Sequence, residues 1–542
     1  MKKNILIISF VIGSLLCFSS CNDFTKMNED PTKWTTVDPN NQITYIELVI
    51  WGNLIPAYTY FAYFQPFVQQ FMGEWRATNQ GGLYTKDDEI TKLMWDRTYT
   101  YSIKNLVDIL EKTEGKPEYV NVRAVARILK VYHFMILTDT YGDLPYFQGG
   151  KGYAGISTPT YDEQRLIYLD FLNELRESEA ELSSEGGVLT GDIIYSNDIH
   201  KWKRFANSLR LRVAMRMVYA EPALARDEVM DIMLSPSGLL NQDEDAMVPY
   251  MDFRDKDNYE FRRNALSESW ISHEAWPHAM ICSVFFDHML KTGDPRTFRI
   301  ARCYPETPAS RNNPFSRLDI TEEVIEEVKA GNLKWDPVKP GKFFYEELGS
   351  TYYYSEIRED YVSGYMLRPQ LNNVFLKGST PGLILSYAEV QFLLIEAVSR
   401  WPEMALDGTP IEDLYANGVR AAMNLLLKYG VESYKSNEIS DYLAANPFPA
   451  GEEARIQAIN EQLWVLNFFN PPEVYANWRR SGYPVLKPSG DYGATTVHSK
   501  TIPRRLCYPL EETRYNAKSQ QVALDRMGGS DDWNARVWWD KK

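Results

Sequence analysis

KWKRFANSLRLRVAMRMVY, residues 201–219, is the stretch that decides the fold. Its apolar residues recur every three or four positions, which places Trp202 and Phe205 on one face of a helix. Arg212 and Arg216 occupy another face. A helix of this kind buries its apolar side against neighbours, and arginines held in such packing need carboxylate partners. The stretch therefore predicts a packed helical protein with internal ion pairs.

Similar spacing on both sides of this stretch predicts further helices. They are expected over 95–112, 119–137, 160–182, 386–397, 411–429, 452–466 and 471–481. Two of them open with capping-box spacing, Thr160 with Glu163 and Ser386 with Glu389. The helices favour antiparallel pairs that resemble degenerate tetratricopeptide-type units. The expected fold class is therefore mainly α.

The stretch from 236 to 380 differs from its flanks. It is rich in Asp, Asn, Pro, Gly and Tyr and shows few sustained periods. Long irregular segments on a rigid helical frame are usually functional. We expect a single domain over 41–542, made of a helical block (41–235), a loop-rich insert (236–380) and C-terminal helices (381–542) that end in an extended tail from 491.

The N-terminus has the pattern of an export signal. Two lysines precede an apolar run over 5–18 that is too short to span a bilayer, and the run ends in FSSC at 18–21. Small residues before a cysteine predict a lipoprotein signal peptide over 1–20, an acylated Cys21 and a lipidated tether over 21–40. Cys17 fits less well because Leu16 precedes it. The alternative is an ordinary secretory signal cleaved near Ser20.

Charge and composition limit the partners. The chain of 542 residues carries a formal charge of -15, which gives it no electrostatic reason to bind nucleic acid or an anionic bilayer surface. Aromatic residues make up 13%, with 35 Tyr and 14 Trp, so flat side chains are available for stacking on a ligand as well as for the core.

Six short motifs occur in an order that resembles the SusD/RagB-like nutrient-binding lipoproteins of Bacteroidota. The motifs are NEDP (28–31), TDTYGDLPY (138–146), KWKRFANSLRLR (201–212), SYAEV with a following EA (386–390 and 396–397), NWRRSGYP (477–484) and IPRR (502–505). The resemblance covers nearly the whole chain. Each motif is weak alone, and the six in register behind a lipoprotein signal are specific.

The resemblance implies a fold, a location and a partner. The fold is a mainly helical frame built on four tetratricopeptide-like helix pairs. The location is the outer membrane, with the protein lipid-anchored and exposed at the cell surface. The partner is a SusC-like, TonB-dependent β-barrel transporter, to which the lipoprotein delivers an oligosaccharide or, as the alternative of the RagB type, a peptide.

The most recognisable motifs are expected to hold the frame. Asp139 and Asp143 flank the glycine turn of the second motif, where their carboxylates would cap backbone amides or pair with arginines. Arg210, Arg212 and Arg216 are the expected partners of those carboxylates. We assign the segment 478–480 the same structural role.

The ligand site is expected among aromatic residues of the irregular parts. Sugar rings stack their C–H faces on Trp and Tyr, while nearby amide and guanidinium groups bind the hydroxyls. We expect a ligand-binding loop over 75–84, after an aromatic-rich helix, and further ligand contacts from aromatic residues of the insert. The candidate ligand-binding residues are Trp75, Arg76, Asn79, Tyr84, Trp270, Trp276, Trp335 and Tyr353.

No motif predicts catalysis or a cofactor. The six histidines include no H-E-x-x-H, and neither a G-x-S-x-G elbow nor a P-loop occurs, so the chain is expected not to be an enzyme. Calcium at the acidic loop 241–245 stays an alternative, although the spacing is not that of an EF-hand. Cys282 and Cys303 are expected to be free thiols, with a bridge as the alternative. A surface glycosidase and a protein-interaction scaffold stay as rival functions.

Overall fold

The computed structural model describes residues 37–542 apart from 73–75, 253–259, 272–279, most of 303–338, 343–368 and 405–407. Cys21 and the proposed signal and tether up to residue 36 lie outside the described residues. The first block consists of α3 (Pro39–Gly52), α4 (Leu54–Thr59), α5 (Gln65–Phe67), α6 (Asp88–Arg97), α7 (Lys104–Thr113), α8 (Val120–Tyr141), α9 (Gln164–Glu181), α10 (Ile199–Arg216) and α11 (Pro222–Leu234). Three π-helical segments interrupt it: η2 (Tyr60–Phe64), η3 (Ala77–Gly82) and η4 (Thr98–Ile103).

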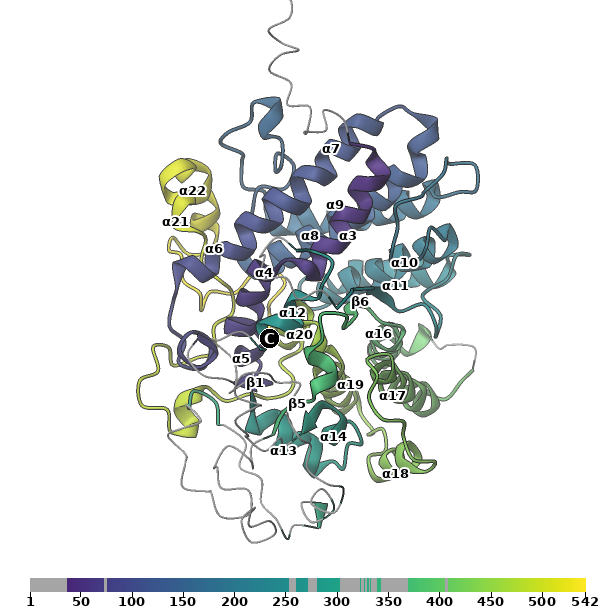
Figure 1. Ribbon diagram of the computed structural model, residues 1–542, viewed down its shortest axis with the longest axis vertical. Helices are drawn as coiled ribbons and strands as arrows, with labels where there is room; N and C mark the ends of the chain where they lie inside the picture. The colour runs from purple at the N-terminus through teal and green to yellow at the C-terminus, as the bar shows by residue number, and fades with distance from the viewer. Residues whose placement is uncertain are drawn as a thin grey trace, which may run out of the picture.

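The second block lies after the insert. It consists of α16 (Tyr387–Arg400), α17 (Ile411–Leu427), α18 (Glu438–Ala445), α19 (Glu452–Leu466), α20 (Pro471–Ser481), α21 (Leu510–Tyr515) and α22 (Ala517–Arg526). Successive helices pack on one another in both blocks: α7 on α8, α8 on α9, α9 on α10, α10 on α11, and α16 on α17 and α19. Figure 1 shows most of the first block in the upper half, with α5 lower beside β1, α16–α19 at the lower right and α21–α22 at the left. The protein is mainly α, as expected.

The insert adds short helices and strands between the two blocks. They are α12 (Ala265–Ser269), α13 (Ser283–Lys291) and α14 (Thr297–Ile300), with β2 (Ala246–Val248), β3 (Met280–Ile281), β4 (Ala301–Arg302) and β5 (Gln370–Leu371). β2 pairs with β6 (Gly382–Leu385), and the other three join β1 (Phe71–Met72) in a second sheet. Among the described residues, no helix combines the length and apolarity needed to cross a membrane.

The stretch at 201–219 forms α10, and its two faces behave as their spacing predicts. Trp202 and Phe205 are at most 1% exposed in the core. Arg212 donates to both carboxylate oxygens of Glu389 at 2.6 and 2.9 Å, and Arg216 lies 2.5 Å from Glu473. These pairs tie α10 to α16 and α20, so the ion pairs join the first block to the second.

The end of α8 and the turn after it contain the two aspartates of the motif at 138–146, and both have structural partners. Asp143 accepts from the backbone N–H of Gln164 at 2.8 Å and so caps α9, and it also accepts from Arg526 Nε at 2.6 Å. Asp139 lies 3.3 Å from Arg216. The structural roles expected for both carboxylates are thereby confirmed. The prediction of a capping box at Thr160 is wrong. α9 begins at Gln164, and Asp143 caps it instead.

Two of the arginines expected to pair with those aspartates have other partners. Arg210 binds Glu228 and Asp231, each at 2.5 Å, and Arg212 binds Glu389. Both arginines are at most 3% exposed, so each needed a carboxylate within reach of its own turn of α10. Sequence spacing places these side chains on faces of the helix but does not say which element covers each face.

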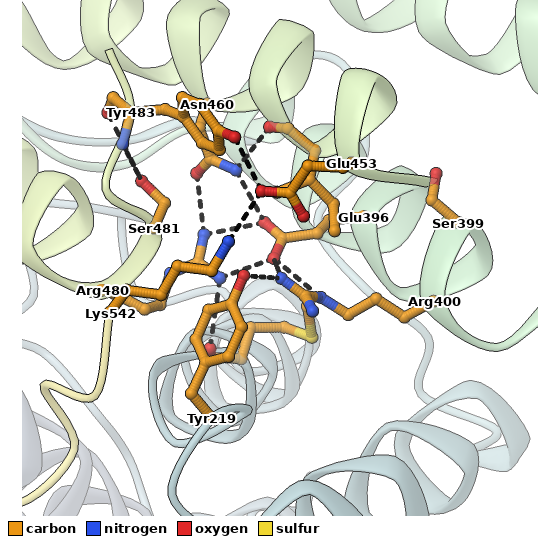
Figure 2. Close-up of polar contacts among 12 residues, drawn as sticks. Tyr219, Glu396, Ser399, Arg400, Glu453, Asn460, Arg480, Ser481, Tyr483 and Lys542 are labelled. Atoms are coloured by element: carbon orange, nitrogen blue, oxygen red, sulfur yellow. Dashed lines mark hydrogen bonds and ion pairs between the residues drawn. The ribbon is translucent and has the colours of Figure 1, made fainter. Parts of the chain in front are cut away.

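Glu396 is the centre of a buried polar network in the second block (Figure 2). Both of its oxygens accept from Arg480 at 2.7 Å, and Arg400 binds it as well. Asn460 lies against the same carboxylate and guanidinium. Burial disfavours the carboxylate, but the two arginines outweigh it and hold the pKa of Glu396 at about 2. The structural role expected for the segment 478–480 agrees with this geometry.

The tail corrects the expectation of an extended loop from residue 491. It contains α21 and α22, and its last residues return to the core. Trp539 is fully buried, and its indole Nε1 donates to Asp139 at 2.8 Å. The tail therefore closes the structure against the turn between α8 and α9.

Candidate functional site

The four-stranded sheet has the order β1-β3-β5-β4, and every strand is two residues long and antiparallel to its neighbours. Met72 pairs with Met280, Met280 with Gln370, and Gln370 with Arg302. These four residues therefore form a single row across the sheet. At a strand spacing of about 4.8 Å the row is roughly 14 Å long.

The row coincides with the ends of the segments in which the sequence places four aromatic candidates. Trp75 follows Met72 by three residues, and Trp276 precedes Met280 by four. Trp335 belongs to the segment that leaves β4, and Tyr353 to the segment that enters β5. These four side chains lie outside the described residues. The sheet nevertheless brings together chain positions that are separated by hundreds of residues.

Buried side chains fix the sheet to the frame. The side chain of Gln70 donates to the carbonyl of Trp464 at 2.6 Å, and the indole of Trp464 donates to the carbonyl of Val68 at 3.0 Å. The backbone N–H of Cys282 donates to the carbonyl of Gln70 at 3.0 Å. Trp464 belongs to α19, so these contacts hold β1 and β3 rigidly on the second block. Figure 1 shows β1 and β5 beside α13 and α19 in the lower half of the molecule.

Tyr84 and Trp270 are core residues. Tyr84 is 1% exposed and its hydroxyl accepts from the backbone N–H of Ser489 at 3.0 Å; burial raises its pKa to about 12. Trp270 is 1% exposed, donates to Gln65 at 2.9 Å and packs near Phe468. Neither ring offers a face to a ligand in this conformation. Trp and Tyr with one polar atom satisfied internally are as suited to a core as to a binding site.

Arg76 and Asn79 are half-buried, at the start of and within η3. The loop expected over 75–84 is thus helical in its described part. Two adjacent glycines explain the difference, because a Cβ on Gly81 would lie 2.3 Å from the carbonyl oxygen of Ala62. The glycines permit close helix packing here. In the sequence alone they have the same appearance as the glycines of a loop.

Burial disfavours the charged forms of two titratable groups that follow β3 in the chain. Cys282 is a buried free thiol, as expected, and burial raises its pKa to about 12. Cys303 lies outside the described residues. Burial also lowers the pKa of His288, which packs on Trp464. Within the described part of the chain, no three His, Cys, Asp or Glu side chains are grouped so that they could hold a metal. Two of the six histidines, His273 and His278, lie outside the described residues.

Two of the three carboxylates in the acidic loop considered for calcium are engaged by the protein, those of Glu244 and Asp245. Glu244 accepts from Arg204 at 2.7 Å and from the backbone N–H of Asn241 at 3.0 Å. Asp245 caps α16 by accepting from the N–H of Tyr387 at 2.7 Å, and its other oxygen pairs with Lys428. The loop therefore joins the insert to the second helical block.

Comparisons with known proteins identify the class to which this frame belongs. A family model for SusD-like proteins, described as "Starch-binding associating with outer membrane", matches residues 38–316 and 342–509. The chain belongs to the SusD-like family. No curated protein sequence matches it significantly.

Solved structures agree with this assignment. A Bacteroidetes AC2a SusD-like protein has 32% identity and a TM-score of 0.84, over 93% of this chain and 100% of that one. A chitin-binding protein has 32% identity and a TM-score of 0.77 with the same coverage. A chitin-binding SusD homologue from Flavobacterium johnsoniae has 22% identity and a TM-score of 0.69, over 93% and 99% of the two chains, and shows the shared fold.

Proposed function

We propose that this protein captures an oligosaccharide at the bacterial cell surface and delivers it to a SusC-like, TonB-dependent barrel. It is held at the outer membrane by lipid on Cys21 and does not transform its ligand. The row formed by Met72, Met280, Gln370 and Arg302 is the observation that carries the proposal. In this proposal the row is the common base from which the segments that carry the four aromatic candidates extend.

The mechanism follows from the chemistry of sugars. Stacking on aromatic rings contributes area without demanding one sugar sequence, and polar side chains at the ring edges supply orientation. In the proposed site Trp75, Trp276, Trp335 and Tyr353 provide the rings, with Arg76 and Asn79 at the margin. Tyr84 and Trp270 support the site from the core. Moderate affinity suits this role, because the ligand has to leave again toward the transporter.

Chitin oligosaccharides are the first ligands to test, because the solved structures similar to this chain include two chitin-binding proteins. Calorimetry on the full chain in detergent should detect binding of N-acetylglucosamine hexamers. Trp75→Ala and Trp276→Ala should each weaken the affinity at least tenfold. Tyr153→Ala is the matched control, since Tyr153 is 87% exposed on a loop of the first block.

Other outcomes of this experiment select the rival functions. A panel of peptides that binds while all glycans fail would establish peptide capture. Release of reducing ends from the hexamer would establish a glycosidase. Failure of both panels, with the barrel still co-purifying, would leave a protein-interaction scaffold.

The anchor is tested by fractionation of cells. Cys21→Ser should move the chain from the membrane to the soluble fraction and abolish incorporation of labelled palmitate. Cys17→Ser is the control and should leave both properties unchanged. Equal labelling of the Cys21→Ser chain would contradict acylation at this residue.

A further inference from the structure

A cavity of about 410 Å³ lies between the turn after α8, the first turn of α9 and the C-terminal tail. This volume falls within the range of ordinary small-molecule sites. None of its lining residues belongs to the sheet described above. Two smaller cavities, of about 20 and 10 Å³, have the size of single water molecules.

An aromatic residue, Trp538, is among those that line the cavity. Trp538 is half-buried, its backbone N–H donates to the side-chain oxygen of Gln164 at 2.7 Å, and its ring packs 5.7 Å from that of Tyr168. Gln164 is itself fixed, because its amide donates to the carbonyl of Thr138 at 2.7 Å. The indole is therefore held on α9 before any ligand arrives.

The buried carboxylates of the lining are already satisfied. Asp143 accepts from Arg526 and from the N–H that it caps, as described above. Asp540, with a fully buried side chain, accepts from Arg504 at 2.8 Å and from Arg536 at 2.7 Å. Glu163 is half-exposed and 3.7 Å from Arg526. The acidic groups thus face arginines.

Two cationic groups of the lining remain available to a ligand. Four cationic side chains and three carboxylates line the cavity, and Arg165 and Arg526 are already held in ion pairs. Arg536 is 48% exposed and uses one terminal nitrogen for its contacts with Asp540 and the main-chain oxygen of Lys542. Lys541 is exposed and forms no ion pair with a described residue. Arg165 lies at the opposite margin and pairs with Glu221 at 2.6 Å.

We propose that this cavity is a second saccharide site, specific for an acidic sugar. The pyranose ring stacks on Trp538, and the carboxylate is bound by Arg536 and Lys541. A planar guanidinium and a mobile ammonium together satisfy a carboxylate without displacing the internal pairs. A neutral sugar has the same ring but gains nothing from the two cations, and a simple anion gains nothing from the indole.

Binding of digalacturonic acid to the full chain in detergent tests the proposal. Calorimetry should detect binding that is at least tenfold tighter than that of neutral galactobiose and that weakens as salt rises. Arg536→Gln and Lys541→Gln should each weaken the acidic disaccharide at least fivefold and leave galactobiose unchanged. Lys518→Gln is the matched control, because Lys518 is exposed on α22 and outside the cavity.

The aromatic contribution needs its own variant. Trp538→Leu should weaken digalacturonic acid at least fivefold with little change in melting temperature, and Trp538→Phe should restore part of the affinity. Loss of acidic-sugar binding in the cavity variants, with binding at the sheet intact, separates this site from the proposed function. Equal affinity of all cavity variants would overturn the proposal, as would complete competition by sulfate at the same concentration.

Discussion

Glu47 of α3 is a fully buried carboxyl group beside a second buried carboxyl, that of Asp192. The backbone N–H of Ile193 donates to Glu47 at 2.7 Å, while Asp192 accepts from the N–H groups of Tyr195 and Asn197. Burial is the main cause that raises the pKa of Glu47 well above its usual range, and the charge and hydrogen bond of Asp192 add to it. The raised pKa favours the protonated form of Glu47 beside Asp192.

This proton predicts the direction of one pH dependence. The folded-state pKa of Glu47 lies above the unfolded value of about 4.3, so its stabilising contribution is complete below that value and is lost as pH rises through the folded pKa. Glu47→Gln should therefore flatten the fall in melting temperature between pH 5 and pH 8. Glu111→Gln, at an exposed position of α7, is the control. An unchanged slope in Glu47→Gln would refute the shared proton.

Arg480 belongs to a buried ion pair in which the pKa of the carboxyl group, that of Glu396, is lowered instead of raised. Its guanidinium is 1% exposed and the carboxylate of Glu396 is fully buried. Figure 2 shows the two groups facing each other. Removal of one partner leaves a buried charge, which costs about 3–5 kcal/mol. Arg480→Met should reduce the free energy of unfolding, measured with urea, by about 3 kcal/mol, because Arg400 still binds Glu396.

The double variant Arg480→Met with Glu396→Gln tests whether the remaining pair of Glu396 with Arg400 limits the cost. It should be less stable than Arg480→Met alone, because it leaves the guanidinium of Arg400 without a carboxylate partner. Because the pKa of Glu396 is held at about 2, its contribution is present above the unfolded value and is lost only as pH falls through about 2. Arg480→Met should therefore be less destabilising at pH 2 than at pH 7.

At the scale of elements, the C-terminal tail is a structural part of the first block. Trp539 fills the space beside Arg216 and Arg479, whose guanidinium groups lie 5.5 and 4.9 Å from its ring, and it donates to Asp139. Trp539→Ala should lower the free energy of unfolding by about 3–5 kcal/mol. Trp539→Phe keeps most of the packing and loses the hydrogen bond, so it should cost about 1–3 kcal/mol. Equal losses in both variants would show that the hydrogen bond alone matters.

The helices were predictable and several of their junctions were not. α19 begins at Glu452 and ends at Leu466, as its apolar spacing indicates, and Ser386 caps α16 through the N–H of Glu389 at 3.1 Å. Glu389 does not complete the capping box, because Arg212 binds its carboxylate. Periodicity reports which face a helix buries. It does not report a partner that is distant in the sequence.

The candidate site was predictable in composition but not in placement. A strand of two residues is too short to show alternation, so β1, β3, β4 and β5 leave no pattern in the sequence. Tyr84 and Trp270 have the composition of ligand-binding residues, and only tertiary packing shows that they are buried. The cavity at Trp538 was missed for the same reason, since the tail that forms it carries no sustained period.

At the scale of the whole molecule, the ion-paired frame and the proposed ligand site belong to different parts of the chain. The motifs that identify the family, around Asp139, Arg212 and Arg480, form buried ion pairs within each helical block and, through Arg212, between the two blocks. The sheet rests on this frame through Gln70 and Trp464. Substitutions in the frame should therefore change stability first, and substitutions in the aromatic segments should change affinity first.

A cross-link between β1 and β3 tests directly whether the sheet is a fixed part of the frame. Met72 and Met280 are Cα partners although 208 positions separate them in the sequence. Paired residues of antiparallel strands have Cα atoms about 4.5–5.5 Å apart, which suits a disulfide. The chain with Met72→Cys and Met280→Cys, in a background of Cys282→Ala and Cys303→Ala, should form this bond on oxidation and raise the melting temperature. Met72→Cys with Lys518→Cys is the control that should not cross-link.

The same cross-linked chain decides whether the sheet is the base of the ligand site. If the sheet is a rigid base, the disulfide should leave oligosaccharide affinity unchanged or improve it, because less ordering remains to be done on binding. Reduction should return both melting temperature and affinity to their starting values. Abolished binding in a cross-linked chain that melts normally would mean that ligand entry requires β1 and β3 to separate. The sheet would then act as a gate, and the aromatic segments would have to be placed elsewhere.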